Sequence, residues 1–366
     1  MKKDYYNVIG VMSGTSLDGV DLAHIQFWIK NDRWTFEILE SETISYDSNW
    51  ISILKTAVDY TENQLVELNK NYTQLLASII NVFIKKYAIH NLDAVCSHGH
   101  TILHQPQNGF TLQIGNLPEI ARLTQQKIVC DFRVQDVQLG GQGAPLVPIG
   151  DRILFHEYDY CMNLGGFSNV SFEKNNSRIA FDISAVNTVL NFYANQLGLD
   201  YDNKGQISRS GQLNTDLLHE LNSLPFYKIL PPKSLGFEFV KEVVLPIIEK
   251  YSISTEDKLH TYTEHISVQI AFSLNNFETS KEKKRSMLIT GGGAYNDFLI
   301  ERIQFYMPKM EIIIPSPKIL EFKEALIFGL LGVLKMRDEV NALQSVTGAQ
   351  HDHSSGVIFE KLEDIL

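Results

Sequence analysis

The residues best suited to chemistry stand near the N-terminus, in a short turn between two apolar runs. Residues 13–19 read SGTSLDG, with two glycines, three hydroxyls and one acid. Backbone amides can converge on an anion in such a turn because glycine has no Cβ to block the approach. Thr15 and Ser16 can donate hydrogen bonds to phosphate oxygens, and Asp18 can position Mg²⁺ through water. The turn is predicted to bind phosphate; the alternative is a plain turn in which Asp18 bonds its own backbone.

Three further glycine-rich turns are candidates for the same role, in NLGGFSN, GGQG and TGGG. Two standard phosphate motifs are excluded. Gly14 and Gly19 have the spacing of a P-loop, but Val20 stands where that motif needs a lysine. Gly291 and Gly293 are followed by Asn296 instead of a third glycine, which breaks the dinucleotide fingerprint.

The elements that must position these turns follow an α/β pattern. Apolar residues recur at spacings of three and four over 62–88, which predicts a helix with one buried face. A Gly/Pro-rich break at 139–151 predicts a boundary between a domain of residues 1–150 and one of residues 151–366. The stretch YDYCMNLGGFSNVSFE then repeats the strand, turn and strand of the opening stretch. The two hairpins indicate an internal duplication.

Composition narrows the class of protein. The 366 residues are 44% hydrophobic, enough for two cores, and the net charge of −11 argues against binding nucleic acid or an anionic membrane. Cys96, Cys130 and Cys161 lie in apolar runs and are predicted to be buried free thiols. Neither a signal peptide nor a spanning helix is predicted, so a cytoplasmic location is expected.

A set of motifs in one order resembles the 1,6-anhydro-N-acetylmuramic acid kinases. The motifs are MSGTSLDGVD, SHGHTILHQP, TLQIGN, CDFRVQDVQLGGQGAPLVP, MNLGGFSNVSF, PPKSLG, LITGGGAYN, FKEALIFGLL and SVTGA. The resemblance implies the two-domain, actin-like ATPase fold of the sugar kinase/Hsp70/actin superfamily, with duplicated RNase-H-like α/β domains and ATP in the cleft between them. An open alternative is that the C-terminal tail packs back on the first domain.

The resemblance also implies a reaction. An enzyme of this family uses ATP, with Mg²⁺, to hydrolyse the 1,6-anhydro bridge of anhydro-N-acetylmuramic acid and to phosphorylate O6. The products are N-acetylmuramic acid 6-phosphate and ADP, in the recycling of cell-wall fragments. The partner is thus a small amino sugar, and a homodimer is left open.

Catalytic and sugar-binding residues are carried over position by position. Asp182, in AFDISAVN, matches the catalytic aspartate and is expected at a strand end, where it activates water; the alternative is an N-cap of the helix that begins near 186. Arg133 and Glu324 match positions near the sugar, Arg133 being suited to a carboxylate such as the lactyl group. The alternative for this pair is a salt bridge.

Nucleotide-binding residues follow from the same matches. They are Ser13, Gly14, Thr15, Ser16, Asp18 and Gly19 in the first turn, Gly165 and Gly166 in the second, and Gly291, Gly292 and Gly293 on the adenosine side, with Asp18 also as the metal residue.

Three histidines, His98, His100 and His104, suggest a zinc site as an alternative, because strand alternation would place the first two on one face. Hydrogen bonding near the substrate is preferred, and His98, which matches the family, is expected to be a substrate-binding residue with Arg133 and Glu324. The HDH at 351–353 is expected to be a solvated loop.

The chain departs from the family beside the catalytic aspartate. Ile183, Ser184, Ala185 and Val186 stand where Thr-Gly-Pro-Gly is common, and a positive φ at Val186 would be strained. His100 and Tyr295 replace residues that are often Gln and His. Two alternatives therefore stay open: a kinase of another sugar, or a catalytically weak nucleotide-binding homologue.

Overall fold

The chain forms two compact α/β units in a computed structural model, which describes residues 2–14, 17–277 and 285–361. Unit 1 comprises Met1–Phe155 and Phe322–Leu366, and unit 2 comprises His156–Glu321. Unit 1 thus extends to residue 155, five residues beyond the boundary expected at 150, and it includes residues 322–366, in line with the option that the C-terminal tail packs on the first domain. The Gly/Pro-rich segment is part of unit 1 because it leads into helix α5 (Val147–Leu154), whose Asp151 pairs with Lys323 at 2.7 Å.

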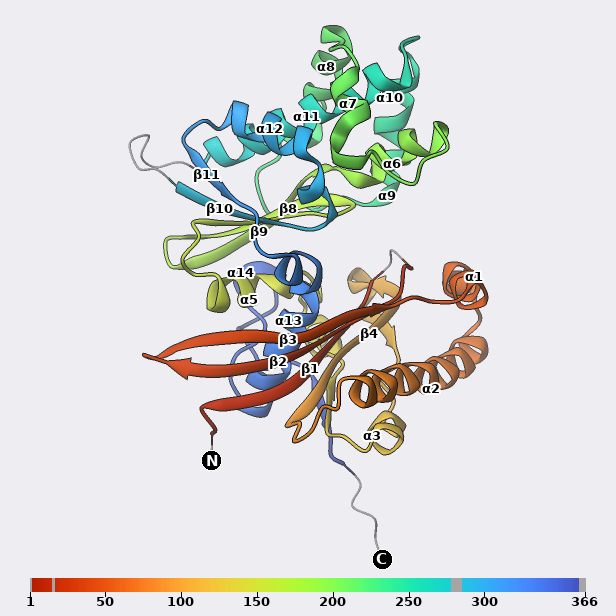
Figure 1. Ribbon diagram of the computed structural model, residues 1–366, viewed down its shortest axis with the longest axis vertical. Helices are drawn as coiled ribbons and strands as arrows, with labels where there is room; N and C mark the ends of the chain where they lie inside the picture. Colours follow the sequence, from red (N-terminus) through yellow and green to blue (C-terminus); the bar gives the residue numbers. More distant parts are fainter. Residues whose placement is uncertain (1, 15–16, 278–284, 362–366) are drawn as a thin grey trace, which may run out of the picture. The chain divides into compact units, whose positions relative to one another are not determined.

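Unit 1 is built on a seven-stranded sheet (Figure 1). Its strands are β1 (Tyr5–Ser13), β2 (Val20–Lys30), β3 (Arg33–Ile44), β4 (Ala94–Gln105), β5 (Phe110–Ile114), β6 (Ile128–Cys130) and β12 (Val357–Phe359). The order is β12-β6-β4-β1-β2-β3, with β5 paired to β4. Strands β1, β4 and β6 are parallel, whereas β2, β3, β5 and β12 each run antiparallel to a neighbour.

Unit 2 carries a five-stranded sheet in the order β11-β10-β7-β8-β9. Its strands are β7 (Tyr160–Leu164), β8 (Phe167–Lys174), β9 (Ser177–Ala185), β10 (Arg285–Thr290) and β11 (Met310–Ile313). Strands β7, β10 and β11 are parallel, and the β7–β8–β9 meander is antiparallel. The strands β3-β2-β1-β4-β6 of unit 1 correspond in order and direction to β9-β8-β7-β10-β11 of unit 2. This correspondence confirms the duplication predicted from the two hairpins.

The helix predicted over 62–88 is α2 (Glu62–Lys86), one of seven named helices in or largely in unit 1 among the described residues. Those of unit 1 are α1 (Ser48–Thr56), α2 (Glu62–Lys86), α3 (Glu119–Thr124), α4 (Val134–Gln138), α5, most of α13 (Pro317–Met336) and α14 (Gln344–Thr347). Those of unit 2 are α6 (Asn187–Gln196), α7 (Gln206–Ser210), α8 (Thr215–Asn222), α9 (Phe237–Phe239), α10 (Leu245–Glu249), α11 (Thr255–Asn275) and α12 (Asp297–Tyr306). Among the described residues, no helix is both long and apolar enough to span a bilayer.

Two helices cover opposite faces of the unit 1 sheet. Helix α2 buries its predicted stripe, including Leu68 and Leu76, against Ile9 and Val11 of β1. Helix α13 approaches the other face so closely that a Cβ at Gly10 would lie 1.9 Å from the carbonyl oxygen of Ala325. Cys96, Cys130 and Cys161 are buried and free, as predicted.

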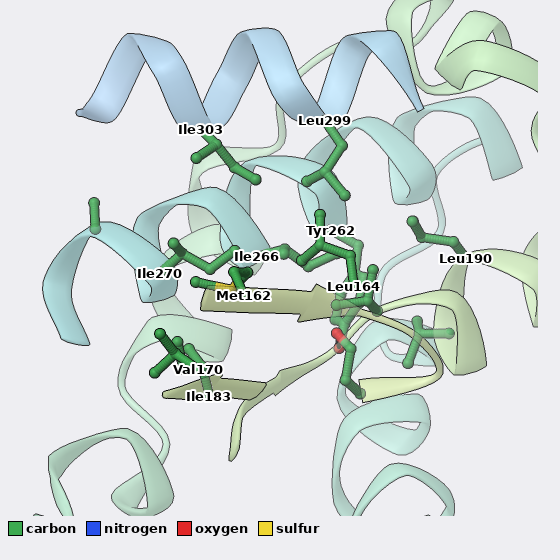
Figure 2. Close-up of a cluster of buried hydrophobic side chains, with 14 of the residues drawn as sticks. Met162, Leu164, Val170, Ile183, Leu190, Tyr262, Ile266, Ile270, Leu299 and Ile303 are labelled. Carbon is green, nitrogen blue, oxygen red and sulfur yellow. Dashed lines mark hydrogen bonds between the residues drawn. The ribbon is translucent and has the colours of Figure 1, made fainter. Parts of the chain in front are cut away.

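The core of unit 2 lies between its sheet and helices α6, α11 and α12. Figure 2 shows side chains from all four meeting there: Met162, Leu164, Val170 and Ile183 from the sheet, Leu190 from α6, Tyr262, Ile266 and Ile270 from α11, and Leu299 and Ile303 from α12. The N-cap of helix α12 is Asn296, whose side chain accepts a hydrogen bond from the Leu299 amide at 2.9 Å. The Asn296 that breaks the dinucleotide fingerprint is thus a helix cap.

The contact between β1 and α13 gives a stability prediction. Gly10→Ala places a methyl group inside the α13 backbone, so the free energy of unfolding is expected to fall by about 3 kcal/mol. Gly109→Ala, at a positive φ of 68° with nothing within 4 Å, is the matched control and is expected to cost about 1 kcal/mol from backbone strain alone. Urea unfolding followed by circular dichroism measures both, and equal losses would contradict the proposed close packing.

Candidate active site

The turn after β1 is anchored by a buried hydroxyl. Ser13 Oγ lies 2.6 Å from the Tyr46 hydroxyl and 2.8 Å from His100 Nδ1, and the Tyr46 hydroxyl lies 2.5 Å from that of Tyr72 on α2. Burial lowers the pKa of His100 to about 4 and raises the pKa values of both tyrosines, so the three rings are neutral at pH 7. This chain of hydrogen bonds fixes the base of the turn.

The rest of the turn is partly described. Thr15 and Ser16 lie outside the described residues. Asp18 is exposed, and Gly19 is buried with a φ of 155° and with the carbonyl of Ile44 where a Cβ would stand. Gly14, the other glycine of the turn, is half-buried.

The histidines of β4 do not share a face, so the expectation from simple alternation is wrong. The β1–β4 pairing steps from Val11↔Ser97 to Ser13↔His100, which inserts one extra residue into β4. Gly99 sits in this bulge with a φ of 75°, a value that favours glycine. His98 consequently packs on Phe328 of α13, whereas His100 packs on Tyr72 of α2. The two rings cannot bind one metal ion together, and the described residues contain no group of three metal ligands.

His98 contacts Arg133 directly. Arg133 Nε donates to His98 Nε2 at 2.7 Å, and Arg133 Nη1 donates to the carbonyl of Gly143 at 2.6 Å. His98 Nδ1 lies 2.9 Å from the carbonyl of Gly99. Burial and the adjacent guanidinium hold the pKa of His98 well below its usual range, so the imidazole is neutral.

The charges of Arg133 and Glu324 influence each other, but the two side chains do not form a salt bridge in the described part of the chain. Burial lowers the pKa of the Arg133 guanidinium to about 10, opposed by the carboxylates of Glu324 and Asp136, so it stays charged at neutral pH. Desolvation raises the pKa of Glu324, and the charges of Arg133 and Lys323 oppose this shift. The Glu324 side chain is exposed. No direct ion pair joins Arg133 and Glu324 in the described part of the chain, so the mutual salt bridge considered above is not present.

Sequence reasoning missed Asp136, the residue that holds the Gly143 peptide against Arg133. The carboxylate of Asp136 is fully buried and accepts hydrogen bonds from the Gly143 amide and the Thr347 hydroxyl, both at 2.7 Å. His353 Nε2 lies 3.4 Å from the same carboxylate. His353 is therefore buried, and the expectation that 351–353 is a solvated loop is wrong for this residue. Asp136 and Thr347 lie within motifs quoted above, but nothing in their spacing indicated that they meet.

Asp182 lies inside β9, three residues before the strand ends at Ala185, and not at a strand end as expected. Its Oδ2 accepts a hydrogen bond from the Leu235 amide at 2.9 Å, and its own amide donates to the Lys233 carbonyl at 3.1 Å. Partial burial raises the pKa of the Asp182 carboxyl, opposed by the Leu235 hydrogen bond and the Lys233 charge. Helix α6 has Val186 as its N-cap, so Asp182 does not cap it.

The four residues after Asp182 adopt a conformation that needs no glycine. The β8–β9 pairing steps from Ser168↔Ser184 to Asn169↔Asp182, which makes Ile183 the extra residue of a bulge. Val186 has a φ of −124°, is fully buried, and donates its amide to the Gly166 carbonyl at 2.8 Å. The strain considered for a positive φ at Val186 does not arise.

The two glycine turns of unit 2 follow β7 and β10, neighbouring parallel strands. The carbonyls of Gly165 and Gly166 accept hydrogen bonds from the first amides of α6, at 3.2 Å from Asn187 and 3.3 Å from Thr188. Gly291 has a φ of 83°, and a Cβ there would lie 2.5 Å from Asn163 Oδ1.

This close packing places the Gly292 and Gly293 amides at the carboxyl end of the sheet. No partner for either amide occurs among the described residues. Amides at such a turn suit an anionic group.

Comparisons with known proteins identify the relatives of this chain. The family model of anhydro-N-acetylmuramic acid kinase matches residues 6–361. The anhydro-N-acetylmuramic acid kinase of Mannheimia succiniciproducens is 33% identical over 99% of this chain and 100% of its own length. Those of Francisella tularensis subsp. novicida and Bacillus cereus strain AH187 are 33% and 30% identical, covering 95% and 94% of this chain and 97% and 96% of their own lengths.

The conformation at Val186 can be tested directly. Val186→Gly removes a buried side chain and adds backbone freedom, so the free energy of unfolding is expected to fall by about 3 kcal/mol. Val58→Gly, at an exposed valine, is the control for the loss of a surface side chain. If Val186→Gly were neutral or stabilising in urea unfolding, the backbone at 186 would need the left-handed conformation after all.

Proposed function

The chain belongs to the anhydro-N-acetylmuramic acid kinase family, and from this premise we propose that it hydrolyses the 1,6-anhydro bridge of anhydro-N-acetylmuramic acid and phosphorylates O6. The products are N-acetylmuramic acid 6-phosphate and ADP. The proposal includes the place of this reaction, the recycling of cell-wall fragments in the cytoplasm. ATP supplies the phosphoryl group.

The observation that carries the proposal is the state of the Asp182 carboxylate. One oxygen is tied to the Leu235 amide at 2.9 Å, while the other has no partner among the described residues. A general base needs this arrangement: one oxygen fixes the orientation and the other accepts a proton. The raised pKa makes the ionised carboxylate a stronger base than a solvated aspartate.

The proposed reaction couples hydrolysis of the 1,6-anhydro bridge to phosphoryl transfer. Asp182 takes a proton from water as the water oxygen bonds to C1 of the sugar. The bond from C1 to O6 breaks, and O6 bonds to the γ-phosphorus as the bond from that phosphorus to the β-γ bridging oxygen breaks. Catalysis of phosphoryl transfer rests on positioning and charge stabilisation, so the residues around Asp182 chiefly bind and orient.

Nucleotide contacts are proposed for the glycine turns. Among residues 2–14, 17–277 and 285–361, the Gly292 and Gly293 amides have no partner and can donate to a phosphate. Asn163 crowds Gly291, so that position excludes a side chain. Gly165 and Gly166, with Ser13, Gly14, Thr15, Ser16 and Gly19 of the first turn, complete the proposed set. The exposed carboxylate of Asp18 is a hard oxygen donor of the kind that Mg²⁺ prefers, and it is proposed to hold that ion through water.

Sugar contacts are proposed for Arg133 and Glu324. Arg133 keeps N–H donors beyond the two that it spends on His98 and Gly143, and these suit the lactyl carboxylate. The exposed carboxylate of Glu324 can accept hydrogen bonds from sugar hydroxyls.

A second candidate, a kinase of another sugar, is favoured by one observation. The bulge at Ile183 and the buried Val186 stand beside the proposed base, where the family commonly has glycines. Mass detection of the phosphorylated product over a panel of sugars separates the two candidates. Phosphorylation of the anhydromuramic sugar with gain of one water supports the proposal, and a clear preference for an ordinary hexose would reject it.

Replacement of the base gives the first functional prediction. Asp182→Asn keeps the shape of the side chain but cannot take a proton, so sugar-dependent ADP release is expected to fall about 100-fold or more. Nucleotide affinity, measured by calorimetry, should be unchanged. Asp159→Asn, outside the proposed machinery of unit 2, is the control. Full activity in Asp182→Asn would rule out this residue as the base.

The charge of Lys233 gives a prediction for the pH profile. The active form of Asp182 is ionised, so activity is lost as pH falls through its raised pKa. Lys233→Met removes a positive charge that lowers this pKa, so the acid limb of kcat is expected to move to higher pH. Lys241→Met, an exposed lysine of unit 2, should leave the limb in place. A shift to lower pH, or the same shift in both variants, would contradict the assignment.

A further inference from the structure

The side chain of Arg133 is oriented by two protein acceptors before any ligand binds. Its Nε–H is given to His98 Nε2 at 2.7 Å and one Nη1–H to the Gly143 carbonyl at 2.6 Å. Nε and Nη1 lie on opposite flanks of the planar guanidinium, so these two contacts fix its plane and its rotation. The remaining N–H groups, one on Nη1 and two on Nη2, have no partner in the described part of the chain. At the Nη1–Nη2 end of the guanidinium, one N–H on each nitrogen can grip a carboxylate through two parallel hydrogen bonds.

The hydrogen bonds of His98 fix its tautomer. A backbone carbonyl only accepts, so His98 Nδ1 must carry the proton that bonds the Gly99 carbonyl at 2.9 Å. A guanidinium only donates, so His98 Nε2 must present its lone pair to Arg133. Both ring nitrogens are therefore occupied, and the ring is 2% exposed and packed on Phe328. His98 has neither surface nor hydrogen-bonding capacity left for a sugar.

The second acceptor is held just as firmly. The Gly143 peptide gives its carbonyl to Arg133 and its amide to Asp136 Oδ2 at 2.7 Å. Asp136 is fully buried, and its Oδ1 accepts from the Thr347 hydroxyl at 2.7 Å. The guanidinium is thus held by His98 of β4 and by Gly143 of the loop between α4 and α5, and Thr347 of α14 supports that loop through Asp136.

We propose that His98 is a positioning residue that holds the Arg133 guanidinium in place for the carboxylate of the sugar, and is not itself a sugar ligand. The inference rests on the proposed function and deepens it, because it assigns selection of a carboxylate-bearing anhydrosugar to the His98–Arg133 pair. It differs from the expectation drawn from the family match, in which His98 was placed among the substrate-binding residues. A neutral imidazole suits this role because a protonated one would repel the guanidinium.

Two substrates separate positioning from a general structural role. Anhydro-N-acetylmuramic acid carries the lactyl carboxylate, and anhydro-N-acetylglucosamine lacks it. His98→Phe keeps the ring against Phe328 but removes the acceptor for Arg133. KM for the carboxylate sugar is expected to rise about tenfold or more, while KM for ATP and the kinetics with the carboxylate-free sugar stay unchanged. His98→Gln, which restores an acceptor oxygen, should recover most of the loss.

A double-mutant cycle tests whether His98 acts through Arg133. In an Arg133→Met background, His98→Phe should have no further effect on KM for the carboxylate sugar. His90→Phe, an exposed histidine of the same unit, is the matched control, and thermal unfolding of each variant checks the fold. Additive effects, or equal losses with both sugars, would overturn the positioning role and leave the proposed function intact. If the wild-type protein does not prefer the carboxylate sugar, both the proposed function and this inference are wrong.

Discussion

Close packing between helix α13 and the sheet of unit 1 is the constraint on which the sugar side of the proposed site depends. A Cβ at Gly10 would stand 1.9 Å from the Ala325 carbonyl oxygen, and a Cβ at Gly332 would stand 2.2 Å from Cys96 Sγ. Because both positions lack a side chain, the helix backbone settles directly on β1 and β4. This distance brings Phe328 against the ring of His98 and sets the charge of Glu324 beside Arg133. Helix α13 therefore does more than cover apolar strands. Its close approach to the sheet also sets the positions of Glu324 and of the His98 ring.

The duplicated sheet was adapted differently in its two copies. Both units place a turn after their first strand, and both sheets share one strand order and one set of directions. In unit 1 the turn is fixed by side chains, through Ser13 and its buried tyrosine and histidine partners. In unit 2 the Gly165 and Gly166 carbonyls are fixed by backbone amides at the start of α6. The actin-like architecture implied by the family is consistent with this repeat, because the same supersecondary unit provides a polar turn at corresponding ends of two sheets.

Sequence periodicity and motif order predicted the elements well and the side-chain directions poorly. Helix α2, both hairpins and the free thiols were predictable because their signals are local. The bulges at Gly99 and Ile183 were not, because a bulge is a property of the pairing between two strands. The first bulge turns His100 away from the face of His98, and the second lies next to Asp182, in a strand that continues past it. The fully buried Asp136 escaped notice for a related reason: its partner Thr347 is far along the chain, and no spacing rule joins them.

In the proposed reaction, Asp182 activates a water molecule to attack C1, so that the bridge oxygen stays with the phosphate at O6. Turnover of anhydro-N-acetylmuramic acid in ¹⁸O-labelled water tests this directly, with unlabelled product kept in the same water to correct for exchange at C1. Fragment masses of the sugar phosphate, taken early in the reaction, locate the isotope. We expect one labelled oxygen at C1 and none at O6 or in the phosphoryl group. Label at O6 or in the phosphate, or a product without label, would contradict the account.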